Sequence, residues 1–534
     1  MSEATSPSTA STATDSRALP FGKAAALALL CSLFYWGAFP TDPAHDKGGL
    51  LAFIAYVPFF FAIRGQTPKR AAQLGLLSGT VMNVGGFYWL LDMLKTFSGF
   101  PTALCALFVL IVATYQGGRM ALTGWLIRRA ELRGYGFQLA ATLAFIASEV
   151  AFPVLFPWYF GATVHTMPAF LQVADLGGPV LVSLAVFAAN LAIYQMLLLR
   201  FDPAARIRGV AYAAVPFALS ALYGIFQIRR VDAIAAKADR AVVGIVQGNL
   251  ALIQKREDPA EGLRRHFRIS EDLRRKGAEF LVWSESSVTM PIEESLSKRF
   301  LRDRVGRNLK IPAVFGGVLY RRDKDRERWF NTAVSTTKEG EIVSRYDKHF
   351  LLAFGEYLPF GDDFPILYQW SPNSGRFSKG DNLEPLTLTV GGVERKLSTL
   401  ICYEDVLPGF TNDAVLTAKD PDILVNITND AWFGNTSEPW EHFALAKFRA
   451  IEHHRYLVRS TNSGVSGVVD PLGRVISLGG MYRAEGLLSE VRFLKGSTLF
   501  ETIGFWPWYA ASLASFVIAF RHLRKRVVAP SKAG

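Results

Sequence analysis

Cys402 is the residue of this chain best placed to act as a nucleophile. It ends the apolar run Leu400-Ile401 and is followed at once by Tyr403 and Glu404. A thiol at the turn from a strand into a loop can be presented to a substrate, and its thiolate is both a strong nucleophile and a good leaving group. The alternative is a buried structural cysteine at a strand end, and counting cysteines does not separate the two.

Two carboxylates and a lysine stand where they could assist that thiol. Glu285 follows another apolar run, at 280–283, and Lys348 lies in the polar segment 345–350. Taken singly, Glu285 could be a helix-start acid and Lys348 a solvated surface lysine. Glu356 is flanked by aromatic and apolar residues, a setting in which a carboxylate is more often paired than free.

Metal and nucleotide chemistry have little support in the sequence. His442, His453 and His454 lie close together, but they lack cysteine partners and ligand spacing, so the pattern favours a polar helix face. The chain contains neither a P-loop nor a GxGxxG motif. We therefore expect no metal and no organic cofactor.

The positive charge of the chain does not indicate nucleic acid. Over 534 residues the net charge is +12, which invites that interpretation. Residues 231–500, however, carry 37 Lys and Arg against 36 Asp and Glu, so +11 of the charge lies elsewhere. The same remaining residues contain the long apolar runs. The sequence thus indicates a basic, hydrophobic membrane portion and a nearly neutral globular portion, with no nucleic-acid partner.

About eight apolar runs are candidates for membrane spans, each near the roughly 20 residues that a span needs. Seven precede the globular portion, and they lie at 22–39, 48–64, 72–97, 101–127, 136–160, 173–199 and 209–228, with an eighth at 500–520. The expected organisation is a disordered tail (1–16), a membrane domain (17–229), a globular domain (230–498), and a last span with a basic tail (499–534). The first run has no cleavage site after it and is interpreted as an anchor.

Lysine and arginine in the short loops predict the orientation. With both termini inside, the inner segments carry 16 of these residues and the outer segments 4. Seven spans then place residues 230–498 outside the cytoplasm. Of the three cysteines, Cys31 and Cys105 fall in predicted spans, so Cys402 has no disulfide partner in the outer domain. A lone thiol in an oxidising compartment is a liability unless it has a chemical role, but a buried structural cysteine remains an equal alternative on this count.

The globular portion alternates between apolar strand-like runs and charged helical segments, which is the pattern of an α/β domain. Candidate helices span 258–277 and 295–310. Candidate strands lie at 241–246, 280–283, 313–319, 331–336, 396–402, 423–427, 456–460 and 467–469. Several are continuously apolar, as expected of strands buried on both faces.

The order Glu285, Lys348, Cys402 resembles the catalytic set of the nitrilase (carbon–nitrogen hydrolase) superfamily. The stretch 346–359, YDKHFLLAFGEYLP, and the stretch NDAWFG at 429–434 resemble the apolipoprotein N-acyltransferase family within it, as does the layout of spans. The resemblance implies a polytopic helical membrane domain joined to an αββα sandwich. One departure lies at 247–256, where the proline and aromatic residue common in the family are absent.

The resemblance also implies a role for each residue. Cys402 would be the nucleophile of a ping-pong acyl transfer, Glu285 the general base, and Lys348 the positive charge facing the oxyanion. Glu356 would support Lys348. Tyr403 and Glu404 would shape the site beside the nucleophile.

The implied acyl donor is a phospholipid, and the implied acceptor is the N-terminal amine of a diacylglyceryl-modified lipoprotein. The family resemblance places such an enzyme in the bacterial inner membrane, with its catalytic domain in the periplasm, cytoplasmic termini and no cofactor; we expect a monomer. The aromatic segment 350–370 is expected to form a mobile lid that dips into the bilayer, or else an ordinary core loop. Two alternatives are a membrane-tethered amidase using the same three residues and a transporter with a large outer domain.

Overall fold

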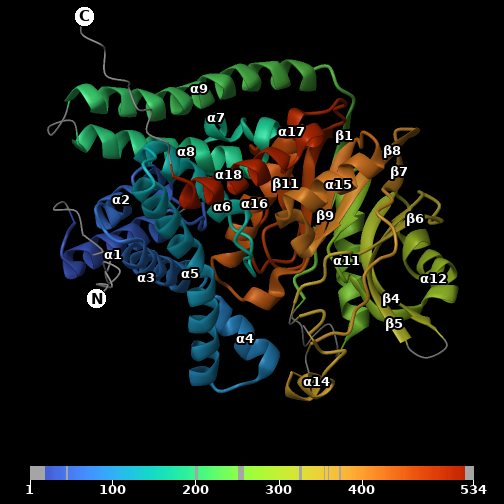
Figure 1. The fold of residues 1–534 in the computed structure, drawn as a ribbon. Coiled ribbons are helices and arrows are strands. Elements are labelled where there is room, and N and C mark those ends of the chain that lie inside the picture. Colours follow the sequence, from blue (N-terminus) through green and yellow to red (C-terminus); the bar gives the residue numbers. More distant parts are fainter. Residues whose placement is uncertain are drawn as a thin grey trace, which may run out of the picture.

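The computed structural model describes most of the chain in two connected halves, a helical one and one built on two sheets (Figure 1). The described residues are 18–43, 46–198, 203–250, 258–323, 327–353, 355–358, 360–371 and 374–522. The predicted tails at 1–16 and beyond residue 522 lie outside them, as do residues 251–256 of the unusual segment.

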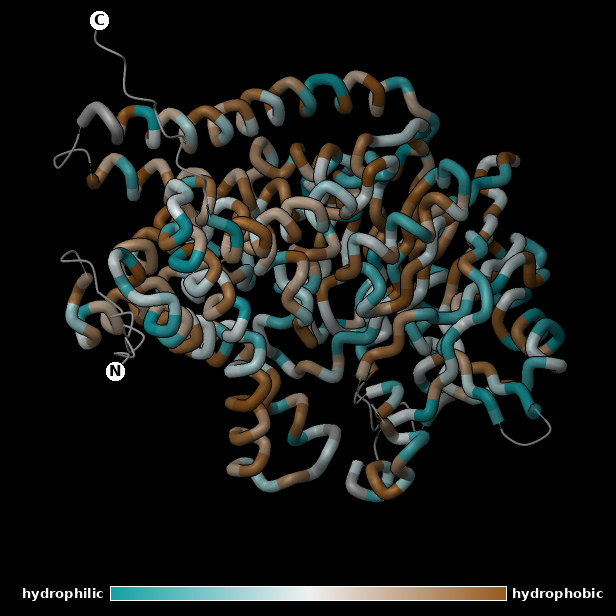
Figure 2. Tube along the Cα trace, viewed as in Figure 1, coloured by the Kyte–Doolittle hydropathy of each residue, from teal (hydrophilic) through white to brown (hydrophobic). Residues whose placement is uncertain are grey.

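The helical half consists of apolar helices packed around a core of aromatic and small side chains. Its elements are α1 (Phe21–Gly37), η1 (Gly48–Phe53), α2 (Val57–Ile63), α3 (Pro68–Gly86), α4 (Leu90–Ser98), α5 (Thr102–Leu132), α6 (Phe137–Val150), η2 (Phe160–Val164), α7 (Pro168–Leu171), α8 (Ala174–Leu198) and α9 (Pro203–Ala235). Two helices after the sheets, α17 (Leu499–Ile503) and α18 (Trp506–Phe520), return to this half. Helix α9 exposes large apolar residues such as Leu222 and Phe226, and Figure 2 shows hydrophobic stretches along this helix.

Part of the predicted span pattern is confirmed. Within the described residues, α5, α8 and residues 207–235 of α9 are long and apolar enough to cross a membrane, and α3 with α4, bent by 61°, would make a fourth. The other apolar runs form shorter helices: α1, η1 with α2, α6, and α18. A helical membrane half is therefore supported, whereas the number eight is not established.

The predicted span at 136–160 is wrong in its second half. Helix α6 ends at Val150, and residues 151–159 run as an irregular loop. Pro153 and Pro157 lack the N–H that a helix needs, so the segment leaves the helical path.

The second half contains two mixed sheets. In each sheet the central strands are parallel and the strands toward the edges are antiparallel. The first has the order β13-β1-β2-β4-β5-β6 with β3 beside β4, and the second has the order β12-β11-β10-β9-β8-β7. The strands are β1 (Arg240–Gln247), β2 (Phe280–Trp283), β3 (Val288–Glu293), β4 (Ala313–Arg322), β5 (Glu327–Thr336), β6 (Ile342–Asp347), β7 (Leu386–Val390), β8 (Val393–Ile401), β9 (Ile423–Thr428), β10 (Leu457–Thr461), β11 (Gly467–Val469), β12 (Val475–Leu478) and β13 (Glu485–Arg492).

Helices cover the outer faces of both sheets, which gives four layers. One buried cluster joins Val243 and Val282 of the first sheet to Val425 and Val458 of the second. Other clusters pack the first sheet against α11 (Pro259–Arg275) and α12 (Glu294–Leu301), and the second against α15 (Pro408–Ala418) and α16 (Glu438–His453). The α/β domain predicted from the alternating pattern, and the sandwich that the family resemblance implies, are both confirmed. Glu285 and Cys402 follow the carboxyl ends of the parallel-paired strands β2 and β8, and Lys348 follows the antiparallel strand β6.

Candidate active site

Cys402 stands at a sharp elbow. Strand β8 ends at Ile401, and Cys402, the first residue of the short helix η5 (Cys402–Val406), adopts a left-handed conformation with φ of 53°. A non-glycine residue in this region is strained and is held there by its surroundings. Asn426 supplies one restraint, because its side-chain N–H donates to the Cys402 carbonyl at 3.2 Å. The nucleophile predicted from sequence is thus buried at a turn.

Glu285, Lys348 and Glu356 meet in one buried cluster. Lys348 Nζ lies 2.7 Å from Glu356 Oε2 and 3.9 Å from Glu285 Oε1, and its side chain is only 1% exposed. Asn331 Nδ2 donates to Glu285 at 2.5 Å and to Glu356 at 2.9 Å. The sequence pattern predicts only that Asn331 begins a strand and does not indicate this bridging amide. The structure therefore brings together the two carboxylates and the lysine that the sequence singled out.

The electrostatics of this cluster keep the lysine charged and the thiol protonated at rest. Burial by itself lowers the pKa of Lys348, but the negative charges of Glu356 and Glu285 outweigh burial and raise that pKa above its usual value, so the ammonium persists. Burial raises the pKa of the Cys402 thiol well above its usual value. The charge of Glu285 raises it further, whereas that of Lys348 lowers it. A base must therefore take the thiol proton during reaction.

Glu404 joins the cysteine elbow to the segment that carries Lys348. Its carboxylate accepts hydrogen bonds from the backbone N–H of Ile401, at 2.7 Å, and of His349 and Phe350, at 2.6 and 3.0 Å. The Tyr346 hydroxyl donates to it at 2.8 Å. Burial raises the pKa of Glu404 to about 7 against these donors. Glu404 thus fixes the distance between two parts of the site and need not touch a substrate to matter.

We expect Glu404→Gln to weaken both stability and activity. A glutamine offers one acceptor oxygen in place of two, so some of the four donors lose their partner, at about 1–3 kcal/mol for each orphaned group. Because the pKa of Glu404 lies above that of a free carboxyl, wild-type stability should fall as the pH rises from 4.5 to about 7. The free energy of unfolding of the two proteins, measured with denaturant between pH 4.5 and 7, should depend less steeply on pH in the variant. An unchanged slope and midpoint would contradict the assigned role.

Tyr403 connects the elbow to the helical half. Its hydroxyl donates to the carbonyl of Leu155 at 3.0 Å, in the irregular loop that follows α6. Packing, which was one interpretation of this tyrosine, is also present, since the ring lies against both cores. The residue next to the nucleophile therefore touches the membrane half directly.

A buried ionic network lies beneath the elbow. Arg459 pairs with Asp405 at 2.5 Å and with Asp430 at 3.3 Å, and its guanidinium also donates to Asn426. His442 Nε2 lies 2.7 Å from Asp405. Burial and Arg459 lower the pKa of His442, but Asp405 and Asp430 outweigh them and raise it to about 10. The network thus balances two carboxylates against two cations.

The expectation of a polar helix face for the histidines is wrong. His442 and His453 are buried, His453 pairs with Glu501 at 3.1 Å, and His454 Nε2 lies 3.1 Å from Asp175. Ligand atoms of Asp430, Glu438 and His442 lie within 4.8 Å of one another, as a metal site would require. In this structure, however, His442 pairs with Asp405 and Asp430 pairs with Arg459, so both groups already have charged partners. Sequence alone could not show that helix α16 is buried on all sides.

The sandwich, with a cysteine, a glutamate and a lysine at its strand ends, has the architecture of a carbon–nitrogen hydrolase. Residues 242–490 match the family model described as Carbon-nitrogen hydrolase. Residues 32–192 match the Apolipoprotein N-acyltransferase N-terminal domain. The two matches cover the two halves in turn.

Relatives that align over about nine-tenths of the chain show to which family within this superfamily the protein belongs. An apolipoprotein N-acyltransferase of Azotobacter vinelandii is 30% identical over 495 residues, covering 89% of this chain and 91% of that protein. One of Geobacter metallireducens is 27% identical over 489 residues, covering 89% and 92%. The solved structure of Saccharomyces cerevisiae Nit3 matches 47% of this chain and 90% of its own, with 17% identity and a TM-score of 0.36. This chain belongs to the apolipoprotein N-acyltransferase family.

Proposed function

We propose that this protein is an N-acyltransferase that moves an acyl chain from a phospholipid to the α-amine of a diacylglyceryl-cysteine at the N-terminus of a lipoprotein. The observation that carries the proposal is the buried Cys402 elbow beside the Lys348–Glu285–Glu356 cluster, in a chain of this family. The product would be a triacylated lipoprotein. Transfer through a covalent enzyme intermediate splits one difficult exchange into two easier steps.

In the first half-reaction, Glu285 takes the proton of the Cys402 thiol and the sulfur attacks the ester carbonyl of the phospholipid. The tetrahedral oxyanion forms facing the ammonium of Lys348, which is already charged and desolvated. As the intermediate collapses, the glycerol oxygen leaves with the proton held by Glu285. A lysophospholipid departs and the acyl thioester remains on Cys402.

In the second half-reaction, the lipoprotein amine attacks the thioester and Glu285 accepts its proton. Lys348 again faces the oxyanion. Collapse breaks the carbon–sulfur bond, an amide forms, and the thiolate regains its proton from Glu285. The positions of Glu285 and Lys348 relative to Cys402 are maintained throughout by hydrogen bonds of Glu356, Asn331 and Glu404.

The arrangement of helix ends supports an inner-membrane protein with cytoplasmic termini. Gln66 donates to the Leu19 carbonyl and accepts from Arg128, both at 2.7 Å. Arg129 lies over the Phe520 ring, 5.3 Å from its centroid. Predicted inner segments from four parts of the chain therefore meet at one end of the bundle. We propose that this basic end faces the cytoplasm and that eight segments cross the bilayer.

The opposite end of the helical half contacts the sandwich, which supports a periplasmic catalytic domain. Lys447 donates to the His165 carbonyl at 2.6 Å, and Gln172 donates to the Leu472 carbonyl at 2.9 Å. Trp89 donates to Glu441 at 3.2 Å. The helical partners all belong to segments near the predicted outer surface. We propose a membrane domain at 17–229, a catalytic domain at 230–498, and a final span with a basic cytoplasmic tail at 499–534. We also propose that the protein is a monomer.

The segment 350–370 has the exposed apolar character of a membrane-facing lid. Phe360 is 71% exposed and Phe364 60%, and α14 (Ile366–Trp370) follows them. In Figure 1, α14 and the first part of α5 both project at the lower edge of the molecule, and Figure 2 shows that this part of α5 is apolar. Glu356 anchors the same segment to Lys348. We propose that the segment opens toward the bilayer to admit acyl chains.

The lid proposal predicts a donor-dependent effect of Phe360→Ser. Losing an aromatic ring that enters the bilayer should slow acylation by phospholipid vesicles by about tenfold. A water-soluble acyl thioester should acylate Cys402 at the wild-type rate, because it does not need the lid. Leu296→Ser, which removes a side chain 59% exposed on α12, is the matched control and should change neither rate. Equal slowing with both donors would contradict a lid.

The alternative is a membrane-tethered amidase that uses the same residues with water as acceptor. Incubation of the purified protein in phospholipid vesicles with a synthetic diacylglyceryl-cysteinyl peptide separates the two. The N-acyltransferase forms equal amounts of triacylated peptide and lysophospholipid. Release of free fatty acid without acylated peptide would overturn the proposal and favour hydrolysis.

A further inference from the structure

Arg119 and Glu149 are charged residues in the apolar half that the proposed chemistry does not use. They lie in α5 and at the end of α6, and their side chains are 13% and 1% exposed. The guanidinium and the carboxylate form a direct ion pair, and Ser183 donates to the second carboxylate oxygen at 3.0 Å. Charges in an apolar interior are costly and persist where they have a task.

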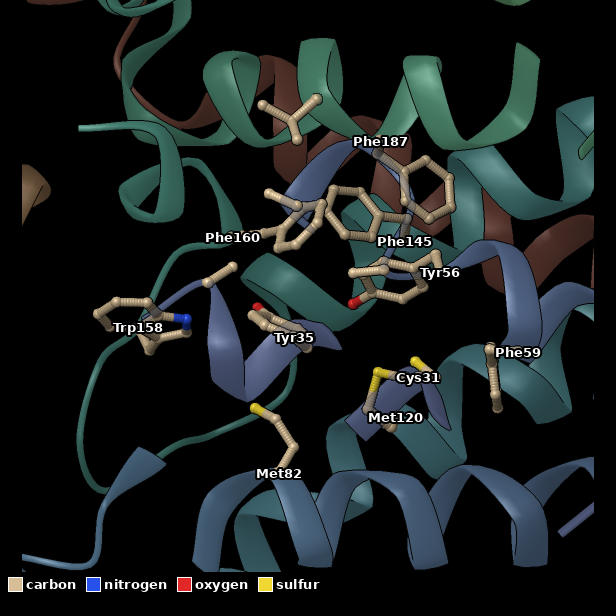
Figure 3. Packing of buried hydrophobic residues seen from close by; sticks show 14 of the residues in the cluster. Cys31, Tyr35, Tyr56, Phe59, Met82, Met120, Phe145, Trp158, Phe160 and Phe187 are labelled. Carbon is tan, nitrogen blue, oxygen red and sulfur yellow. The ribbon is translucent and has the colours of Figure 1, made fainter. Parts of the chain in front are cut away.

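The pair closes the base of the loop that follows α6. Glu149 precedes this loop, and Trp158, near its end, offers its carbonyl to Arg119 Nη1 at 2.7 Å. One guanidinium therefore contacts both ends of the 151–159 loop, through Glu149 just before it and Trp158 near its end. The Trp158 ring stacks on Phe39 with centroids 4.3 Å apart, within the aromatic core that includes Tyr35 and Phe160 (Figure 3).

The tip of the same loop reaches the active site. The Leu155 carbonyl accepts the hydroxyl of Tyr403, the neighbour of the nucleophile. Phe156 N–H donates to the Gln116 side chain at 2.8 Å, and the Phe156 ring packs on Trp89 with centroids 5.4 Å apart. The loop thus touches α5 at its base and middle and the cysteine elbow at its tip.

We propose that Arg119 is a positioning residue for acyl transfer, acting through the 151–159 loop. Arg119 binds both the Glu149 carboxylate and the Trp158 carbonyl. This fixes the position of the Leu155 carbonyl, which accepts the hydrogen bond of the Tyr403 hydroxyl. Arg119 thereby orients Tyr403, the residue next to Cys402. The membrane half then takes part in setting the catalytic geometry besides anchoring the enzyme. This inference rests on the proposed function, since it concerns the same nucleophile.

A double-mutant cycle tests the connection. Arg119→Gln and Tyr403→Phe should each slow single-turnover acylation of Cys402 by phospholipid about tenfold, as misplacement of a reacting group can do. If Arg119 acts through Tyr403, the double variant should also be about tenfold slow, because the second change removes a restraint already lost. Arg119→Lys keeps the charge but has a single nitrogen for both partners. Its acylation rate should therefore lie between those of wild type and Arg119→Gln.

Arg128 is the matched control, since it is also buried in α5, pairs with Glu131 and donates to a backbone carbonyl at Gln66. Arg128→Gln should lower the thermal midpoint as Arg119→Gln does, and its effect should multiply with that of Tyr403→Phe. Multiplying effects for Arg119 and Tyr403, about 100-fold together, would overturn the inference.

A second readout keeps the test independent of lipid chemistry. The rate at which iodoacetamide alkylates Cys402 should show the same non-additive pattern in the four proteins. If Arg119→Gln does not fold, Arg119→Lys replaces it in the cycle. Absence of any acyl-enzyme in wild type would contradict the proposed function, whereas multiplying alkylation effects would contradict only the role of Arg119.

Discussion

Replacing Cys402 with alanine should abolish acyl transfer while leaving the protein folded. The thiol is the only group proposed to bond with the acyl chain, so its loss should lower the turnover rate by at least about 10⁴-fold, as removal of a catalytic nucleophile does. The change removes one buried atom at a position whose backbone strain alanine shares with cysteine. The thermal midpoint should therefore move little.

The other two cysteines supply the controls. Cys31 and Cys105 are both buried in the helical half, and neither forms a disulfide. Their alanine variants remove an atom of the same kind from α1 and α5 and should retain full turnover. Transfer that survives in Cys402→Ala, or is lost equally in all three variants, would contradict a thioester on Cys402.

Lys348→Met and Glu285→Gln should shift the titration of Cys402 in opposite directions. The charge of Lys348 lowers the pKa of the Cys402 thiol and that of Glu285 raises it. Without the ammonium the thiol pKa should therefore rise, and without the carboxylate it should fall. Both variants should nevertheless lose about 10³-fold or more in turnover, because one lacks the charge facing the oxyanion and the other lacks the base.

The measurement is the pH dependence of Cys402 alkylation by iodoacetamide, followed on the purified protein in detergent. The alkylation midpoint should lie above wild type in Lys348→Met and below it in Glu285→Gln. Arg345→Gln, a change in a charged neighbour that pairs with Glu294 and Asp347 at the surface, should leave the midpoint in place. Shifts of the same sign in both active-site variants would show that local unfolding, and not charge, is being measured.

Much of the sandwich could be predicted because its central strands are continuously apolar. The strands predicted at 280–283 and 467–469 coincide with β2 and β11, and the strand predicted at 423–427 covers all but one residue of β9. Strands β3, β6, β7, β12 and β13 were missed. Their burial alternates or is low, as at residues 475–478, so their sequences lack the apolar run that identifies a buried strand.

The candidate site was predicted residue by residue, but its connections were not. Glu285, Lys348 and Glu356 lie at three separate places in the sequence, and only the resemblance to a family grouped them. The bridging role of Asn331 has no local signature, since an asparagine at the start of a strand is most often a turn residue. The pairing of Arg459 with Asp405 and Asp430 depends on contacts across strands and helices, which no periodicity encodes.

The helical half shows where apolar runs mislead. The run at 136–160 has the length of one span, but the helix ends at Val150 and a loop containing two prolines follows. The Leu155 carbonyl of this loop accepts a hydrogen bond from Tyr403. The run at 72–97 bends by 61° between α3 and α4, and this places Trp89 against Glu441 of the sandwich. Hydropathy reports that a segment is apolar, and tertiary contacts decide whether it continues as a helix.

The most direct test of the account is mass spectrometry of wild-type Cys402 after incubation with a phospholipid of one defined acyl chain and no acceptor. The account predicts that the peptide containing Cys402 gains the mass of one acyl group in place of the thiol hydrogen, with one lysophospholipid released for each. Hydroxylamine, or the diacylglyceryl-cysteinyl peptide, should remove that mass. An unmodified Cys402, or an acyl group on a different residue, would contradict the central claim.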